Sequence, residues 1–339
     1  AQLKSSLTII FSFLISLTFA QTGPFFIPVE DSLFLYVKSN DELKLLEKTP
    51  FPITNLYSIY GNDFAIVNHD TTKLIFGSFT DEGLEVINTE KIPISLNTQT
   101  IEYYKSYLFV GGDWKTGTFF YAYHVKNKEW HKIPIPAEIF FPGKAIDDFI
   151  IAADSLIAVD NIVMPKYLIY YPLNSLPETE ASRIFELEPN GTYEGIRKAI
   201  ISEDFIGLLS GTAGGYSKSN SDHVTVIKKN NNSDGFSISS RRNTPFAYYK
   251  WNDIEIVEDK LYIASWENGL GKIKIKERYF KNKTPKYDDP HNREIGKWRI
   301  RYNLFSQKRL TQILKFSKDK LILIYKDKKG EYNFKLQKI

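Results

Sequence analysis

Eight residues of this chain combine the side-chain types that bind sugars or extended peptides. Two tryptophans each stand beside an acid, in Asp113-Trp114 and in Trp266-Glu267. A tryptophan ring offers flat apolar contact, while neighbouring carboxylates and amides form hydrogen bonds with a polar ligand. Four polar residues occupy similar places elsewhere in the chain: Asn68, His69, Asp160 and Asn161.

Each of these segments follows an apolar run that is typical of a β-strand. Between Trp251 and Ile275, aliphatic residues recur at spacing two, the period at which side chains line one face of a sheet. A polar turn at Glu258-Asp259-Lys260 separates the first two runs, and the loop from Trp266 to Gly269 separates the second from the third. We therefore expect Trp266 in the loop after the second strand of a small sheet.

The same hairpin recurs seven times along the chain. The copies are VEDSLFLY, YGNDFAIV, YKSYLFVG, AADSLIAV, SEDFIGLL, VEDKLYIA and SKDKLILI, and the first apolar residues after their turns are Leu33, Phe64, Leu108, Leu156, Phe205, Leu261 and Leu321. Consecutive markers are 31, 44, 48, 49, 56 and 60 residues apart. Repeats of ~40 to 50 residues with several strands each are typical of β-propeller blades, which are stable when neighbours stack on both sides.

The repeats predict an all-β chain folded as a β-propeller of four-stranded antiparallel blades. Seven blades fit the seven hairpins, and six fit if residues 25 to 50 only complete the last blade. That last blade offers three strands, so we expect an N-terminal strand such as Phe25 to Val29 to close it. In a propeller, the loops after the second strands return to one end of the ring. The eight residues should therefore share one surface, unless Trp114 and Trp266 pack between blades as core.

Three segments resemble known repeat families. The segment with Gly111-Gly112, Tyr123 and Trp130 is similar to one kelch repeat. Gly269-Leu270 and Gly83-Leu84, each followed by alternating aliphatics, resemble the secreted LVIVD-type repeat. Both resemblances imply a propeller, and neither implies an activity.

Catalytic motifs are scarce in the sequence. There is no phosphate-binding loop, dinucleotide fingerprint or HExxH motif, and five scattered histidines and no cysteine argue against a metal site. The missing cysteine excludes the copper radical oxidases that resemble kelch propellers. The loop acids Asp113, Asp160 and Glu267 could still serve a glycosidase, which needs two facing carboxylates. We expect no cofactor and no metal.

The first 20 residues have the order of a secretory signal. Lys4 precedes the apolar run from Leu7 to Ala20, which ends in a small-x-small triplet and is shorter than the ~20 residues that span a bilayer. We expect export, a mature propeller over residues 21–339, and no membrane span.

Basic residues gather toward the C-terminus, with 21 Lys and Arg against 7 Asp and Glu from Lys272 onward. Because these lysines alternate with apolar residues, as on solvent-facing strands, they do not indicate a nucleic-acid partner. The sequence favours a non-catalytic binding module for a carbohydrate or protein ligand. The alternatives are a glycosidase-like or lactonase-like propeller enzyme and a structural component of an extracellular assembly.

Overall fold

The computed structural model describes residues 25–29, 32–39, 42–48, 53–68, 72–80, 83–93, 100–111, 118–137, 146–160, 166–187, 194–212, 222–229, 231–239, 251–266, 268–280, 301–303 and 309–339. Within these ranges the chain consists of β-strands, turns and two single-turn 3-10 segments, Leu173–Ser175 and Glu277–Tyr279, without an α-helix. The expected signal at residues 1–20 lies outside the described residues.

The strands follow one another closely along the chain. They are β1 (Phe25–Val29), β2 (Ser32–Ser39), β3 (Glu42–Lys48), β4 (Ile53–Tyr60), β5 (Asp63–Asn68), β6 (Lys73–Thr80), β7 (Gly83–Lys91), β8 (Thr100–Tyr104), β9 (Tyr107–Gly111), β10 (Phe119–His124), β11 (Glu129–Pro134), β12 (Ile146–Ala152), β13 (Ser155–Asp160), β14 (Lys166–Pro172), β15 (Arg183–Leu187), β16 (Glu194–Ile201), β17 (Phe205–Thr212), β18 (His223–Lys228), β19 (Asn231–Ser239), β20 (Trp251–Val257), β21 (Lys260–Ser265), β22 (Gly269–Lys274), β23 (Arg301–Asn303), β24 (Arg309–Lys315), β25 (Lys320–Lys326) and β26 (Tyr332–Lys338).

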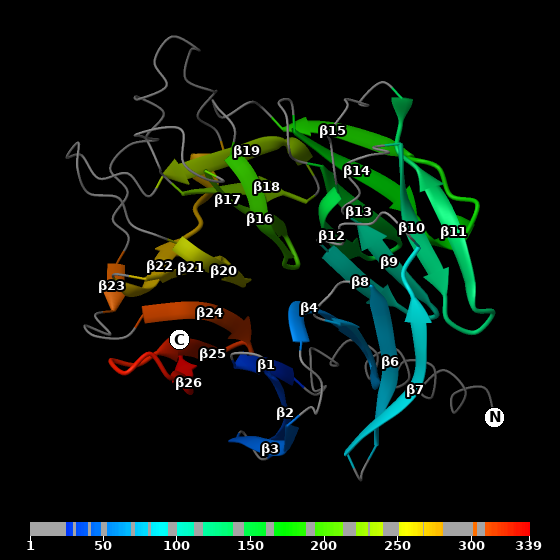
Figure 1. Ribbon diagram of the computed structural model, residues 1–339. Helices are drawn as coiled ribbons and strands as arrows, with labels where there is room; N and C mark the ends of the chain where they lie inside the picture. The colour runs from blue at the N-terminus through cyan, green and yellow to red at the C-terminus, as the bar shows by residue number, and fades with distance from the viewer. Residues whose placement is uncertain are drawn as a thin grey trace, which may run out of the picture.

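The described strands form seven antiparallel sheets, each built from consecutive strands (Figure 1). Five sheets have four strands, namely β4–β7, β8–β11, β12–β15, β16–β19 and β20–β23. The sheets β1–β3 and β24–β26 have three strands each. The sheets surround a centre where the first strands β4, β8, β12, β16, β20 and β24 contact one another in turn (Figure 1).

Hydrophobic clusters join each sheet to the next, as stacking blades require. Leu209 and Val224 of sheet β16–β19 share one cluster with Ile254 and Leu261 of sheet β20–β23. Equivalent clusters fill the interfaces between sheets β4–β7 and β8–β11, β8–β11 and β12–β15, β12–β15 and β16–β19, and β20–β23 and β24–β26. The alternating aliphatics predicted between Trp251 and Ile275 all lie in the first of these clusters, which confirms the expected strands.

The seven markers all lie on the second strand of a sheet, so the repeat prediction is confirmed with one correction. Leu156 pairs with Ile151 and Leu261 with Ile256, one position in from the turn. In sheet β16–β19 the equivalent residue is Ile206, because Phe205 itself flanks the turn. Phe205 is apolar there because its ring stacks on Phe280 with a centroid distance of 5.8 Å.

Four of the described hairpin turns share a backbone conformation. The first turn residue has a positive φ in four sheets, at Gly61, Lys105, Ala153 and Glu258. A type II′ hairpin takes glycine at this position, because the left-handed region is costly for residues with a Cβ. Three of the four turns therefore carry local backbone strain.

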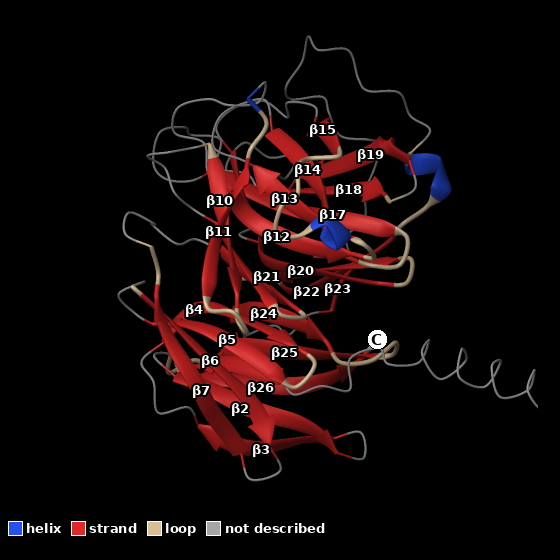
Figure 2. Ribbon diagram, turned by 90° about the vertical axis from the view of Figure 1, so that its right-hand side faces the viewer, coloured by secondary structure: helices blue, strands red, loops and turns tan. Residues whose placement is uncertain are grey.

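The expected closing strand is placed differently from the prediction. Phe25–Val29 pairs with β2, so β1 belongs to a sheet of its own and does not complete the sheet β24–β26. Figure 1 and Figure 2 both show sheet β1–β3 beside β24–β26, and β3 contacts β7 on the other side. The strand β1 pairs with β2, its nearest neighbour in sequence. The spacing of the repeats does not indicate which strand β1 pairs with.

Candidate functional site

The eight sequence-predicted residues fall at the ends of second strands. Asn68 ends β5, Asp160 ends β13, and Trp266 follows β21 directly. The other five residues, His69, Asp113, Trp114, Asn161 and Glu267, lie outside the described residues.

Pairing register shows that these strand ends lie on one face. Asn68 pairs with Ile53 at the start of β4, and Asp160 pairs with Ile146 at the start of β12. Ser265, which precedes Trp266, pairs with Trp251 at the start of β20. Because the first strands surround the centre, equivalent ends of the second strands open onto the same end of the ring. The described part of the predicted surface therefore lies on one side of the molecule.

Asn68 has a structural task on this surface. Its Oδ1 atom accepts hydrogen bonds from the backbone N–H groups of Thr72 at 3.0 Å and Lys73 at 2.7 Å. An asparagine that closes its own loop in this way has little acceptor capacity left for a ligand.

Trp266 differs from the core tryptophan of the same sheet. Trp251 is fully buried, whereas Trp266 is half-buried. The guanidinium group of Arg309, at the start of β24, lies over the Trp266 ring at 5.1 Å from its centroid. The ring therefore lies where sheet β20–β23 meets sheet β24–β26 and keeps part of its surface in solvent.

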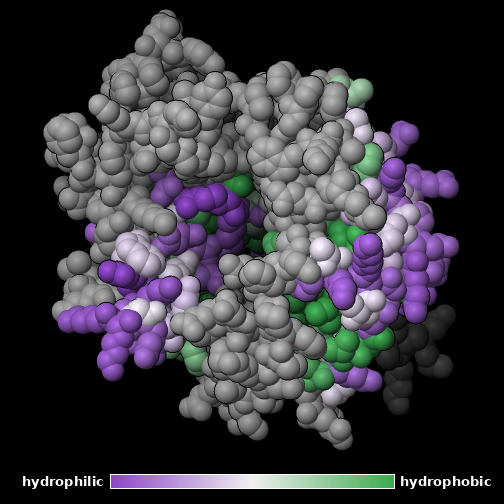
Figure 3. Space-filling model, in the orientation of Figure 1, coloured by the Kyte–Doolittle hydropathy of each residue, from purple (hydrophilic) through white to green (hydrophobic). Residues whose placement is uncertain are grey.

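A second set of polar side chains lines the centre of the ring, and our sequence prediction did not include it. It comes from the first strands: Glu102 on β8, Asp148 on β12, Lys198 on β16, and Asp253 and Glu255 on β20. Hydrophilic side chains lie in a hollow near the middle of the face shown in Figure 3. We call these five residues the axial cluster.

A β-bulge positions part of this cluster. The pairing register of the first strand shifts between Ile146 and Asp148, and likewise immediately before Lys198, Asp253 and Gln312. A bulge adds one residue to a strand and re-aims the side chain that follows it. Four consecutive first strands thus present a polar residue at the same position.

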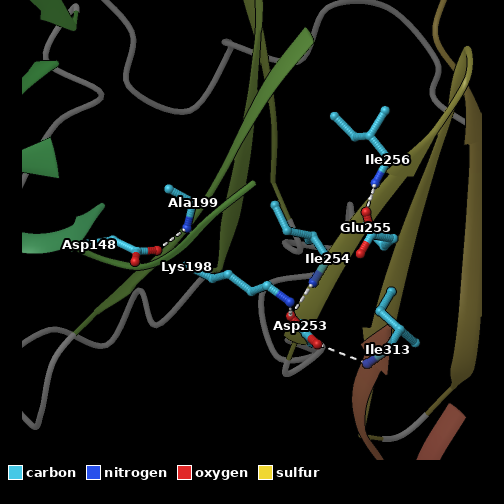
Figure 4. Close-up of polar contacts among 8 residues, drawn as sticks. All are labelled: Asp148, Lys198, Ala199, Asp253, Ile254, Glu255, Ile256 and Ile313. Atoms are coloured by element: carbon cyan, nitrogen blue, oxygen red, sulfur yellow. Dashed lines mark hydrogen bonds and ion pairs between the residues drawn. The ribbon is translucent and has the colours of Figure 1, made fainter. Parts of the chain in front are cut away.

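The residues after the bulges fasten neighbouring sheets to each other (Figure 4). Asp148 Oδ2 accepts a hydrogen bond of 2.6 Å from the backbone N–H of Ala199 on β16. In the same way, Asp253 Oδ2 accepts one of 2.8 Å from the N–H of Ile313 on β24. Lys198 Nζ lies 2.6 Å from Asp253 Oδ1, which links β16 to β20. These contacts join four successive sheets at the centre.

The bulged residues Arg197 and Asn252 form a second set of hydrogen bonds between neighbouring sheets. Arg197 Nη2 donates to the carbonyl oxygen of Trp251 at 2.8 Å, and Asn252 Nδ2 donates to that of Leu310 at 2.7 Å. Both acceptors are the residues before the bulge in the next sheet. Arg197 also pairs with Asp222 at 2.6 Å, and Asp222 accepts a hydrogen bond from the N–H of Trp251.

The axial cluster shifts the pKa values of its members. Burial raises the pKa of Glu102 to about 8, the charge of Asp148 adds to this shift, and the Ser58 hydroxyl opposes it. Burial raises the pKa of Asp148 to about 6 despite hydrogen bonds from two backbone amides. The pKa of Glu255 rises to about 7, again through burial and against the charge of Lys198.

The pKa values of Lys198 and Tyr57 are also shifted by burial and by the neighbouring charges. Burial alone lowers the pKa of Lys198, but the charges of Asp253 and Glu255 outweigh it, so the pKa is raised. Tyr57 on β4 has a raised pKa through burial, opposed by Lys198 and a hydrogen bond with Gln312. Tyr57 therefore reaches from the sheet β4–β7 toward residues of β16 and β24.

The axial carboxylates differ in the number of hydrogen bonds that they accept. Asp148 and Asp253 each accept hydrogen bonds from two backbone N–H groups, so their oxygens hold the sheets together. Glu102 accepts one long hydrogen bond of 3.3 Å from Ser58, and Glu255 accepts one of 3.1 Å from the N–H of Ile256. Raised pKa values at partly exposed carboxylates are also found in catalytic sites.

Neither a metal centre nor a membrane helix is found in the part of the chain that the structure describes. There, no group of three or more His, Cys, Asp or Glu residues could hold a metal ion. The described ranges likewise contain no helix of the length and apolar character that crossing a bilayer requires.

Comparison with known proteins defines the class of fold. No family model matches the chain, and no curated protein matches its sequence. Solved structures match over most of its length. Hydrazine synthase of Kuenenia stuttgartiensis superposes with a TM-score of 0.63 at 10% identity, covering 94% of this chain and 95% of that one. Hsv2 of Kluyveromyces lactis gives 0.54 at 13% identity, covering 94% and 96%.

A third match is YCF48 bound to the D1 peptide, with a TM-score of 0.51 at 12% identity, covering 94% of this chain and 89% of that one. At such low identity a structural match shows the fold alone. Together with the antiparallel sheets around a centre, these matches show that the chain is a β-propeller.

Proposed function

We propose that this β-propeller is an exported, non-catalytic binding module that takes a protein ligand on the face where its second strands end. The observation that carries the proposal is the common placement of Asn68, Asp160 and Ser265, the residue before Trp266, each paired with the first residue of a first strand. Loops held by a rigid scaffold and brought to one face are the usual position of binding residues.

The environment of Trp266 supports a protein ligand. A half-buried indole beside the Arg309 guanidinium combines two of the residue types that dominate binding energy at protein interfaces. YCF48, a propeller of similar fold, is bound to the D1 peptide in its solved structure. A carbohydrate ligand would use the same ring face, so it is the second ligand class to test.

The kelch-type hypothesis rests on one sheet. The Tyr123 and Trp130 rings pair across β10 and β11 with centroids 4.8 Å apart. A Cβ on Gly111 would lie 2.8 Å from the carbonyl oxygen of Ile146 in the next sheet, so the position has no room for a side chain. The two LVIVD-like segments begin β22 and β7, the third and fourth strands of their sheets, and so are not equivalent positions of one repeat.

Selection from a displayed random-peptide library tests the proposed function. Peptides selected by the wild-type protein should bind Trp266→Ala at least about thirtyfold more weakly, because loss of a central aromatic anchor costs about 2 kcal/mol or more. Ile87→Ala, on the exposed outer strand β7, is the matched control and should bind like the wild type. Equal affinity of the selected peptides for Trp266→Ala would contradict the proposal, and a parallel glycan array tests the carbohydrate alternative.

One observation favours an enzyme as the second candidate. Glu102 and Glu255 are partly exposed, weakly hydrogen-bonded carboxyls with raised pKa values, as a general acid requires. A glycosidase or lactonase using them should lose its turnover in Glu102→Gln or Glu255→Gln while keeping its fold. Hydrolysis of a panel of chromogenic glycosides and lactones, compared between these variants and the wild type, tests this candidate.

A further inference from the structure

A chain of polar contacts crosses the interfaces between first strands at the centre of the ring. Ser58 Oγ on β4 accepts a hydrogen bond of 2.9 Å from the N–H of Tyr103 and donates one of 3.3 Å to Glu102 on β8. Thr100 Oγ1, also on β8, donates one of 3.3 Å to Asp148 on β12.

The axial contacts of Asp148, Lys198 and Asp253 continue this chain to β16, β20 and β24. Every interface from sheet β4–β7 to sheet β24–β26 is therefore bridged at the axis by a polar contact. In most of these bridges the acceptor is an ionisable carboxyl group.

Positive charge is scarce among the described groups that face these carboxyls. Lys198 faces Asp148, Asp253, Glu255 and Tyr57, and its ammonium group is already paired with Asp253. Lys315 on β24 acts on Glu255. Thr100 donates to Asp148, and Glu102 follows Thr100 two positions later on the same side of β8, so the carboxyls of Glu102 and Asp148 lie near each other. The Glu102 carboxyl also accepts a hydrogen bond from the Ser58 hydroxyl, and neither neighbour is a cation. The interface between β8 and β12 therefore brings two acids together without a cation beside Glu102.

We infer that protonation of Glu102 controls the contact between β8 and β12 at the axis of the propeller. Protonated Glu102 keeps the two strands packed, and ionised Glu102 loosens their contact. The geometry explains the direction. A neutral Glu102 can lie beside Asp148 without repulsion, whereas two carboxylates across one interface repel each other in a partly desolvated site. The neighbouring sheets would then separate first at the centre.

The titration of the axial acids supports the same direction. The folded-state pKa of Glu102 is about 8, that of Glu255 about 7 and that of Asp148 about 6, all above their ordinary values. Acids with raised pKa values contribute stability that is fully present below the unfolded-state pKa and is lost as the pH rises through the folded-state pKa. The axial contacts between the first strands should therefore weaken steadily from about pH 4 to pH 8.

Thermal unfolding of the whole protein between pH 5 and 9 tests this inference. The wild-type Tm should fall by about 3 °C or more from pH 6 to pH 9, and Glu102→Gln, which mimics the protonated acid, should show a clearly smaller fall. Glu129→Gln, at an exposed acid on β11, should keep the wild-type slope. A wild-type Tm that is flat or rises over this range, or a Glu102→Gln slope equal to the wild-type slope, would overturn the inference.

Hydrogen exchange of the wild type keeps the test decisive if Glu102→Gln does not fold. After correction for the intrinsic pH dependence, exchange at the Phe149 and Ala199 amides, which both donate to Asp148, should accelerate about tenfold or more between pH 6 and pH 9. The Tyr123 amide, on an inner strand of the sheet β8–β11, is the control and should change less. Unchanged protection of the two axial amides across this range would refute the inference.

Discussion

Lys198 Nζ and Asp253 Oδ1 lie 2.6 Å apart and join two different sheets at the centre of the propeller. The Asp253 side chain is 4% exposed and that of Lys198 is 27% exposed, so the pair is largely withdrawn from water. The same aspartate also accepts hydrogen bonds from Ile254 within its strand and from Ile313 in the next sheet. One carboxylate thus connects three successive first strands.

Removing this carboxylate should destabilise the protein strongly. Asp253→Ala leaves the Lys198 ammonium and the Ile313 N–H without their acceptor, and breaking a buried pair typically costs about 3 to 5 kcal/mol. The free energy of unfolding from chemical denaturation measures the loss. Asp259→Ala, which removes the exposed 3.1 Å pair with Lys274, should cost about 1 kcal/mol or less. Similar losses in both variants would mean that the axial contact has no special weight.

Truncation of Trp251 on β20 should cost much more stability than truncation of Trp266, which follows β21. Trp251→Ala empties a fully buried site and should cost about 3 to 5 kcal/mol of stability. Trp266→Ala removes a half-buried ring and one cation–π contact, worth about 1 kcal/mol. Melting curves of the two variants separate these roles. A loss at Trp266 as large as that at Trp251 would make Trp266 a core residue and remove it from the binding face.

The strained hairpin turn at Ala153 offers a stabilising substitution. Ala153 has a φ of 53°, and a residue with a Cβ pays about 1 to 2 kcal/mol in this region. Glycine relieves that cost and loses about 0.5 to 1 kcal/mol through the greater entropy of the unfolded chain, so Ala153→Gly should stabilise by up to about 1 kcal/mol.

Asp154→Gly is the matched control for this turn. Asp154 follows Ala153 directly but does not have a positive φ. It should destabilise the protein or leave it unchanged. A lower Tm for Ala153→Gly than for the wild type would contradict the strain argument.

The proposed export makes a separate prediction about the chain terminus. If residues 1–20 act as a secretory signal, the exported protein should begin at Gln21. Mass spectrometry of the intact mature protein measures this directly. An exported product that retains the run from Leu7 to Ala20 would contradict it.

The sequence predicted the sheets well because each second strand follows a polar turn at a recurring place. The alternation around Ile254 and Ile256 was enough to define two strands and the face they bury. The pairing of β1 could not be predicted, since strand spacing does not say which of two three-stranded sheets an N-terminal strand joins.

The axial cluster was missed for a related reason. Glu255 lies between Ile254 and Ile256, and polar residues that alternate with aliphatics normally indicate a solvent-facing side of a strand. Ring closure turns that side toward the centre, where Lys198 and Asp253 meet from different sheets. The sequence did contain a signal, because polar residues occupy the same position before three turns, at Asp148, Lys198 and Asp253. This pattern indicates a polar centre only once the sheets are known to surround an axis.

The most direct test of the binding face is photo-crosslinking in the cells that make this protein. A benzophenone amino acid placed at position 266 should crosslink to a defined protein partner, while the same probe at position 87, on the exposed outer strand β7, should not. An adduct specific to position 266 is the result that we predict. No adduct at position 266, or the same adducts at both positions, would contradict a binding surface on the face where the second strands end.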